Sequence, residues 1–159
     1  MVIVFTGDGK GKTTAALGQM VRVLGRGKNA LMIQFIKGPW KSGEDEFGGI
    51  ISKGNPSTHS TMAQAFGSEA QARRGGEQSR TTSSGSPAFK LVKMGLGFVG
   101  ILGDKLPREE HQKAAEKALA YFKEELASGK WRLIVLDEVN VAVSLGLLKT
   151  QDVLGAIIK

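Results

Sequence analysis

The chain has 159 residues, of which 41% are apolar and 23% are charged, enough for one ordinary hydrophobic core and too few for two. It has no cysteine, so disulfide frameworks and thiolate metal sites are excluded and a reducing compartment is expected. The net charge of +7 favours an anionic partner. Because the basic residues are scattered and not interleaved with aromatics, we do not expect that partner to be a nucleic acid.

The N-terminus carries neither the basic leader nor the long apolar stretch of a signal peptide. No later stretch approaches the length of a transmembrane helix. The sequence therefore predicts a soluble, cytoplasmic protein with no membrane partner.

The first part of the chain reads as a strand, a helix and a second strand. Residues 2–5 are a short β-branched run that ends in glycines, as in a buried parallel strand. Residues 12–24 repeat apolar positions at three- and four-residue spacing until glycines end the pattern, which predicts a helix. Residues 29–35 form a second apolar strand, so the unit is a right-handed βαβ crossover. We expect an α/β fold whose mostly parallel sheet is flanked by helices.

Residues 48–87 differ in character from the rest of the chain. Serine, threonine, glycine and glutamine dominate there, and periodicity is lost. A structureless stretch of that length is unusual inside a compact domain. We interpret it as an insertion or a disordered loop within a single domain that spans residues 1–159.

Regular patterns return after this segment. Residues 89–94 alternate like a strand, and residues 95–104 form an apolar, glycine-rich loop. Residues 107–126 open with proline and two glutamates and carry an apolar stripe, which predicts a helix. A strand at 133–136 and a helix at 149–158 complete the expected elements.

The loop after the first expected strand has the composition of a phosphate site. Its glycines let the backbone curl so that amide N–H groups point at phosphate oxygens, and the helix that follows adds positive partial charge. Lys12 is expected to reach the terminal phosphates, and Thr13 to give its hydroxyl to Mg²⁺ or Mn²⁺. The first position of the usual motif is glycine, where this chain has threonine. The expected binding residues are Thr6, Gly7, Asp8, Gly9, Lys10, Gly11, Lys12, Thr13 and Thr14.

A phosphate-bound metal needs an acidic residue facing this loop. Asp137 and Glu138 follow an apolar strand, at the sheet edge where α/β folds place their ligands. We therefore predict Asp137 as the carboxylate on the metal side. His59 and His111 are given no role, and Trp40 and Trp131 are expected to be partly in the core.

Together these residues resemble the P-loop corrinoid adenosyltransferases, a family with the P-loop NTPase, RecA-like fold. The resemblance excludes residues 47–87, and it rests on a set of short motifs spread over the rest of the chain. These are residues 5–16, Arg22, 25–27, the Gln-Phe-Ile-Lys-Gly segment 34–38, 43–44, 94–98 and the Val-Leu-Asp-Glu-Val-Asn segment 135–140.

The resemblance implies transfer of the 5′-deoxyadenosyl group of ATP to Co(I) of a corrinoid, with release of triphosphate. Lys12 and the metal would then stabilise charge on the leaving group. The family's pattern implies assistance from Lys10 and Arg22, and contact of Glu138 with the adenosine. Asn140 and Gln34 are predicted to line the same cleft.

Phe98 matches the aromatic residue that packs against the lower face of the corrin in this family. Some members carry a tryptophan two residues later, where this chain has Gly100. The chain also stops at Lys159, before the final strand with which such proteins usually finish, so we expect a truncated member. The family implies a homodimer and a reductase partner, for which a flavoprotein is the expected class.

Two other functions fit the same residues. One is a P-loop kinase or ATPase that acts at the γ-phosphate. The other is a nucleotide- or corrinoid-binding module that has lost catalysis. The products distinguish the three: triphosphate for the adenosyltransferase, ADP for the kinase or ATPase, and no product for the binding module.

Overall fold

The computed structural model describes residues 1–38, 40–46, 87–100 and 104–158. Their centre is a parallel sheet of three strands in the order β2-β1-β3. The strands are β1 (Ala30–Gln34), β2 (Phe89–Lys93) and β3 (Leu133–Asp137). In the parallel register Gln34 lies beside Lys93 on one side and Asp137 on the other. The carboxyl ends of all three strands therefore meet at one edge of the sheet.

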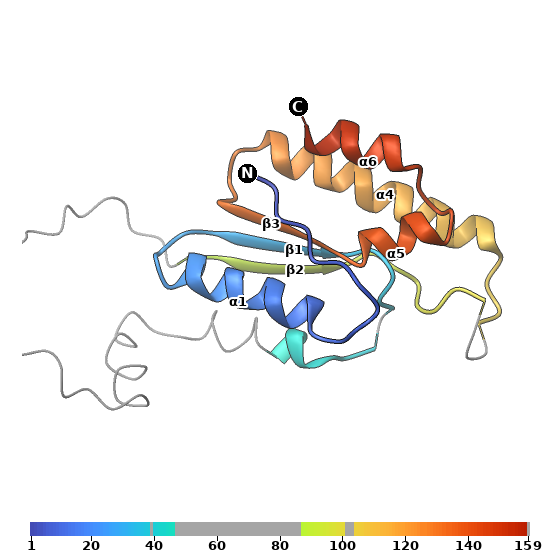
Figure 1. Ribbon diagram of the computed structural model, residues 1–159, viewed down its shortest axis with the longest axis horizontal. Coiled ribbons are helices and arrows are strands. Elements are labelled where there is room, and N and C mark those ends of the chain that lie inside the picture. Colours follow the sequence, from blue (N-terminus) through green and yellow to red (C-terminus); the bar gives the residue numbers. More distant parts are fainter. Residues whose placement is uncertain (39, 47–86, 101–103, 159) are drawn as a thin grey trace, which may run out of the picture.

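Helices cover both faces of this sheet (Figure 1). One face carries α1 (Lys12–Leu24), and the other carries α4 (Arg108–Ala127), α5 (Val139–Ser144) and α6 (Thr150–Ile157). The fold is thus the expected α/β arrangement, a parallel sheet flanked by helices. Among the described residues no helix is long and apolar enough to cross a membrane.

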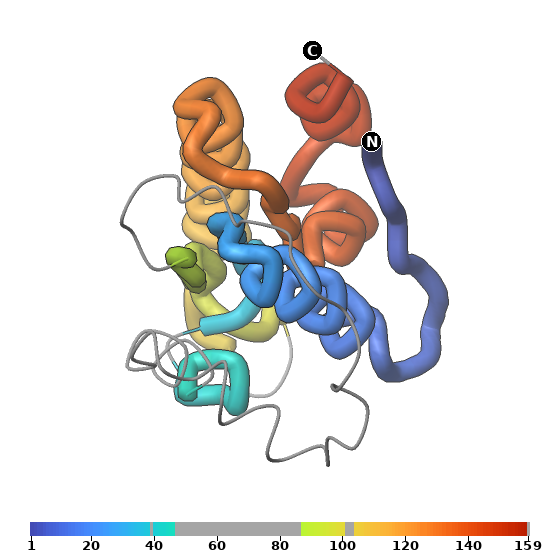
Figure 2. The backbone as a smooth tube through the Cα atoms, turned by 90° about the vertical axis from the view of Figure 1, so that its left-hand side faces the viewer, coloured from blue at the N-terminus to red at the C-terminus, as the bar shows by residue number. Residues whose placement is uncertain are grey.

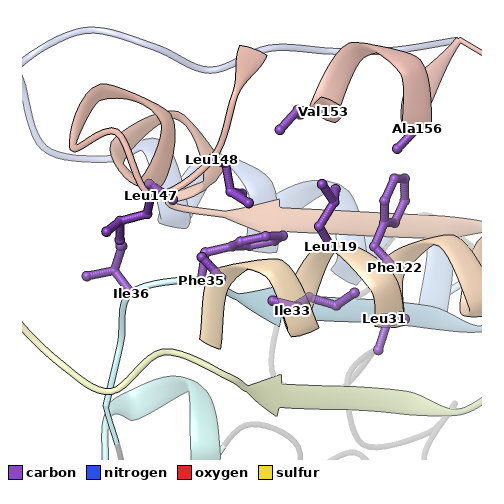
Figure 3. Close-up of a cluster of buried hydrophobic side chains, with 13 residues drawn as sticks. Leu31, Ile33, Phe35, Ile36, Leu119, Phe122, Leu147, Leu148, Val153 and Ala156 are labelled. Atoms are coloured by element: carbon purple, nitrogen blue, oxygen red, sulfur yellow. The ribbon is translucent and has the colours of Figure 1, made fainter. Parts of the chain in front are cut away.

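The central strand divides its side chains between two cores. Leu31 and Ile33 point toward α4, α5 and α6, where they pack with residues such as Leu119 (Figure 3). Ala30 and Met32 belong to the second cluster, on the α1 side. This alternation is the period of a strand covered on both faces, and it explains why every residue of β1 is buried. Gln34 continues the even-numbered series and so faces α1.

The prediction of a strand at residues 2–5 is wrong. Val2, Ile3 and Val4 are 59%, 54% and 66% exposed, and among the described residues β3 pairs with β1 alone. The segment runs outside the sheet, on the side away from β2 (Figure 2). A β-branched run has strand propensity, but a strand exists only when a neighbour accepts and donates its backbone hydrogen bonds.

The other predicted elements within the described residues are confirmed to within two residues at their ends. The short helix α5, which follows β3, was not predicted. The proposed insertion at 48–87 lies almost entirely outside the described residues, as does part of the apolar loop, residues 101–103. Single-domain organisation stays a prediction.

Candidate functional site

The glycine loop and the start of α1 form the first part of the site. Gly7 and Gly11 have φ of +119° and +103°, a backbone conformation that favours glycine. The ammonium of Lys12 donates to the carbonyls of Gly7 and Gly9, each at 2.5 Å. The loop therefore curls around Lys12, whose positive charge lies within the curve.

The N-terminus of α1 is open to a ligand. Gly11 caps the helix without a side-chain hydrogen bond, and the first turn contains no acidic residue. Its free N–H groups and the positive end of the helix dipole therefore face the same region as Lys12. Such an arrangement binds phosphate. The nine predicted binding residues at 6–14 all lie on this loop and first turn.

Asp137 joins this loop to the sheet. It ends β3 and is 6% exposed. Its Oδ1 accepts a hydrogen bond from the Thr13 hydroxyl at 3.0 Å, and its Oδ2 accepts one from Gln34 Nε2 at 2.9 Å. The structure thus brings together the two residues predicted to hold a metal, and Gln34 orients the carboxylate.

One lysine balances the carboxylates around Asp137. Lys37 Nζ lies 2.8 Å from Glu44 Oε1 and 3.9 Å from Asp137 Oδ2. The hydrogen bond from Lys37 is the main cause that lowers the pKa of Glu44 to about 2. Partial burial acts to lower the pKa of Lys37, but the hydrogen bond to Glu44 and the nearby carboxylates outweigh it and raise that pKa. The site is therefore held together by ion pairs as well as hydrogen bonds.

Burial, and then the charge of Asp137, raise the pKa of the Glu138 carboxyl group. Lys37 affects Glu138 less, since its charge and a hydrogen bond from its backbone N–H lower the pKa of that carboxyl group only in part. Glu138 is the one non-glycine residue with positive φ, 64°, in the described part of the chain, and such backbone strain concentrates at functional sites. Among the described residues, Glu138 Oε2 and Gln34 Oε1 are buried oxygens without a hydrogen-bond partner. Both can accept hydrogen bonds from the hydroxyl or amino groups of a ligand.

Two aromatic side chains lie at the same edge of the sheet. Phe98, on the loop after β2, is 50% exposed. Trp40 follows β1 and is 63% exposed, so the expectation that it is partly in the core is wrong. The two rings stack with centroids 6.2 Å apart. Since β2 and β3 are separated by β1, their ends lie about 10 Å apart, which is two strand spacings. The aromatic pair and Asp137 therefore border the same edge of the sheet.

Not every predicted residue reaches this region. Arg22 is exposed in the last turn of α1, about 15 Å along the helix axis from Lys12. Arg22 therefore lies away from the loop, because ten residues of helix separate it from Lys12. Asn140 is exposed near the start of α5, close in sequence to Glu138. Lys10 is exposed on the loop itself.

Sequence reasoning missed two supporting interactions. Glu44 was part of a motif, but its pairing with Lys37 was not foreseen. His111, to which no role was given, is 3% exposed and lies 3.0 Å from Asp104 Oδ2. Asp104 also accepts hydrogen bonds from the N–H groups of Gly100 and Leu106 at 2.8 and 3.0 Å, which lower its pKa. This pair anchors the apolar loop to α4.

A glycine loop that opens a helix, with a buried aspartate bonded to the first-turn threonine, is the arrangement of a P-loop protein of the α/β class. The chain belongs to the ATP:corrinoid adenosyltransferase BtuR/CobO/CobP family, whose model matches residues 1–79 and 61–159. The family inferred from the motifs is confirmed. The matched ranges also run through the low-complexity segment, which the motif resemblance had left out.

Individual relatives carry the same name. The chain is 29% identical to the corrinoid adenosyltransferase of Escherichia coli K12 and to that of Pseudomonas aeruginosa, over 99% of this chain and 60% and 59% of theirs. It is 61% identical to the corrinoid adenosyltransferase CobA of Salmonella typhimurium over 44 residues, which are 28% of this chain and 22% of that protein. The chain thus spans about 60% of the length of the relatives that it matches throughout.

Proposed function

We propose that the chain transfers the 5′-deoxyadenosyl group of ATP to a reduced corrinoid. The electron pair of Co(I) forms the cobalt–carbon bond at C5′, and the C5′–O5′ bond breaks with its electron pair on the leaving triphosphate. No proton transfer at carbon is needed. The protein has to bind the triphosphate, stabilise its growing charge and hold C5′ against cobalt.

Binding of the triphosphate falls to the loop and to Lys12. The ammonium that now contacts the carbonyls of Gly7 and Gly9 would turn to phosphate oxygens. The N–H groups at the start of α1 face the same charge. Donors that are already oriented lower the energy of a developing anion without further reorganisation. This arrangement supports departure of the whole triphosphate.

The residues present fit Mg²⁺ or Mn²⁺ beside the triphosphate. The Thr13 hydroxyl and the Asp137 carboxylate, 3.0 Å apart, supply two oxygen ligands of the kind that these ions prefer. The described residues contain no group of three or more acidic or histidine side chains that would bind a metal alone, so phosphate oxygens and water would complete the shell. When bound, the ion would neutralise charge on the leaving group.

The remaining site residues would position the two reacting atoms, C5′ of ATP and the cobalt of the corrinoid. Glu138 and Gln34, with their unpaired buried oxygens, are suited to the hydroxyl and amino groups of adenosine. Phe98 offers an exposed apolar ring suited to the face of a corrin. The shared sheet edge supports a nucleotide between α1 and β3 and a corrin beside β2.

The observation that carries the proposal is the Thr13–Asp137 contact next to Lys12, in a chain of this family. The test is an anaerobic reaction of the protein with ATP, Mg²⁺ and chemically reduced cobalamin, followed by the corrin absorbance and by analysis of the phosphate product. We expect triphosphate and light-sensitive adenosylcobalamin. ADP would indicate a kinase or ATPase, and ATP binding without product would indicate a binding module. Lys12→Ala should abolish product, and Lys28→Ala, at an exposed lysine beyond α1, is the matched control.

A homodimer, a flavoprotein reductase that supplies Co(I), and a cytoplasmic location remain proposals. The family membership supports the first two, and the cysteine-free composition supports the third. Sedimentation with and without ATP would measure the oligomeric state. Replacing the chemical reductant by a reduced flavoprotein would test the electron donor.

A further inference from the structure

Trp40 is the largest exposed aromatic side chain at the edge of the sheet where the candidate site lies. It is 63% exposed and stacks on Phe98, which is 50% exposed, with an interplanar angle of 29°. A folded protein gains little by leaving two adjacent aromatic rings in water, and such pairs mark places where a ligand or partner covers them. Nothing in the triphosphate site accounts for this pair.

The position of the Trp40 ring is built into the backbone. A β-carbon at Gly38 would lie 2.9 Å from the indole ring, and one at Gly97 would lie 2.7 Å from it. The ring therefore rests directly on two glycines that come from different loops. The N–H of Gly97 donates to the carbonyl of Ile36 at 2.9 Å, which holds these loops together under the ring. Any larger residue at either glycine would displace the indole.

Lys93 ties the other side of Trp40 to the sheet. As the last residue of β2, it donates to the backbone carbonyl of Trp40 and to Asp45 Oδ2, each at 2.5 Å. Asp45 in turn accepts a hydrogen bond from the Ser42 N–H at 2.6 Å. The loop that carries Trp40 is thus fixed to the strand that leads to Phe98, although the ring itself is exposed.

We propose that Trp40 is a positioning residue for the corrin: it holds the Phe98 ring in place and extends the apolar surface on which the lower face of the macrocycle rests. This inference rests on the proposed function. A flat conjugated macrocycle is larger than one phenyl ring, and two stacked aromatic rings at a fixed angle offer it a wider surface. Gly100, two residues after Phe98 on the same loop, has no side chain to contribute.

The two tryptophans of the chain allow a direct measurement. Trp131 lies before β3, at the opposite end of the sheet, where its indole donates to Glu125 Oε2 at 2.6 Å. Trp131→Phe leaves Trp40 as the single emitter, and Trp40→Phe leaves Trp131. On titration of ATP-loaded protein with cob(II)alamin, we expect strong, saturable quenching and reduced acrylamide access in Trp131→Phe. Trp40→Phe should show much weaker quenching.

Kinetics separate positioning from folding. Trp40→Ala should raise the KM for the corrinoid about tenfold, the change expected from loss of an aromatic stacking partner. The KM for ATP should change less than twofold, and Trp40→Phe should restore most of the corrinoid affinity. An unchanged corrinoid KM in Trp40→Ala, or emission from Trp40 that cob(II)alamin leaves unaltered, would overturn the inference while transfer by the unaltered protein continued. If the unaltered protein neither binds nor adenosylates the corrinoid, the proposed function itself fails.

Discussion

Replacing Glu44 with glutamine tests the electrostatic balance around Asp137. Hydrogen bonds from Lys37 and, second, from Ser42 lower the pKa of Glu44 from its ordinary 4.5 to about 2. That difference of about 2.5 pH units, at about 1.36 kcal/mol each, gives a ceiling of about 3.4 kcal/mol for the contribution of the ionised carboxylate to folding. The side chains of Lys37 and Glu44 are 30% and 16% exposed, so water screens the pair, and we expect about 1–2 kcal/mol.

The sign follows from the lowered pKa. Stabilisation by Glu44 is fully present above pH 4.5 and is lost as the pH falls toward about 2. Urea unfolding at about pH 7 and about pH 3 should therefore show a smaller acid-induced loss of unfolding free energy in Glu44→Gln than in the unaltered protein. Glu46→Gln, at an exposed position two residues later, is the matched control. Equal losses in all three proteins would refute the reasoning.

The same substitution should also weaken nucleotide binding. Without Glu44, the carboxylate of Asp137, whose Oδ2 is now 3.9 Å from the ammonium of Lys37, is the remaining ion-pair partner of Lys37 among the described residues. Closer pairing would compete with the Thr13 hydroxyl and with a metal for the same side chain. Isothermal titration with ATP and Mg²⁺ would measure this effect, and Lys37→Met combined with Glu44→Gln should reverse part of it.

Three further predictions concern the site. Asp137→Asn should lower Mg²⁺-dependent ATP affinity at least tenfold in isothermal titration, because it removes the charge beside Thr13; affinity that stays the same would exclude Asp137 from the metal site. Glu138→Gln should raise the thermal midpoint at neutral pH but not below pH 4.5. The reason is that the pKa of Glu138 is raised in the folded protein, so stability falls as its carboxyl group ionises. A difference in thermal midpoint that is constant at all pH values would contradict this. Asp104→Asn should raise the KM for the corrinoid and leave the KM for ATP unchanged, because it weakens the contacts that hold the loop after β2. Parallel changes in both KM values would instead show a general loss of structure.

Most of the confirmed helices and strands were predicted from local sequence patterns. The spacing of apolar residues located α1, β1, β2, α4, β3 and α6, since burial of one or both faces leaves its period in the sequence. Glycines before Lys12 and Thr13 predicted a phosphate loop, because close approach of the backbone to phosphate requires them. Even the Thr13–Asp137 pair could be anticipated, since parallel strands bring their carboxyl ends to one edge.

Residues 2–5 mark where local patterns fail. Their apolar, β-branched composition is that of a strand, yet whether a strand forms depends on a neighbour that composition does not specify. The position of Arg22 has a related cause, since a motif records order along the chain, whereas the length of α1 determines how far the side chain lies from the loop.

The sequence by itself determined the fold class, the position of the glycine loop before α1 and the carboxylate that faces it, because each follows from spacing within one or two neighbouring elements. Only the tertiary structure decided which charges balance Asp137, which buried oxygens stay unpaired and that Trp40 rests on two glycines beside Phe98. These contacts join loops far apart in the chain. Their partners are selected by how the strand ends converge, which no local period records.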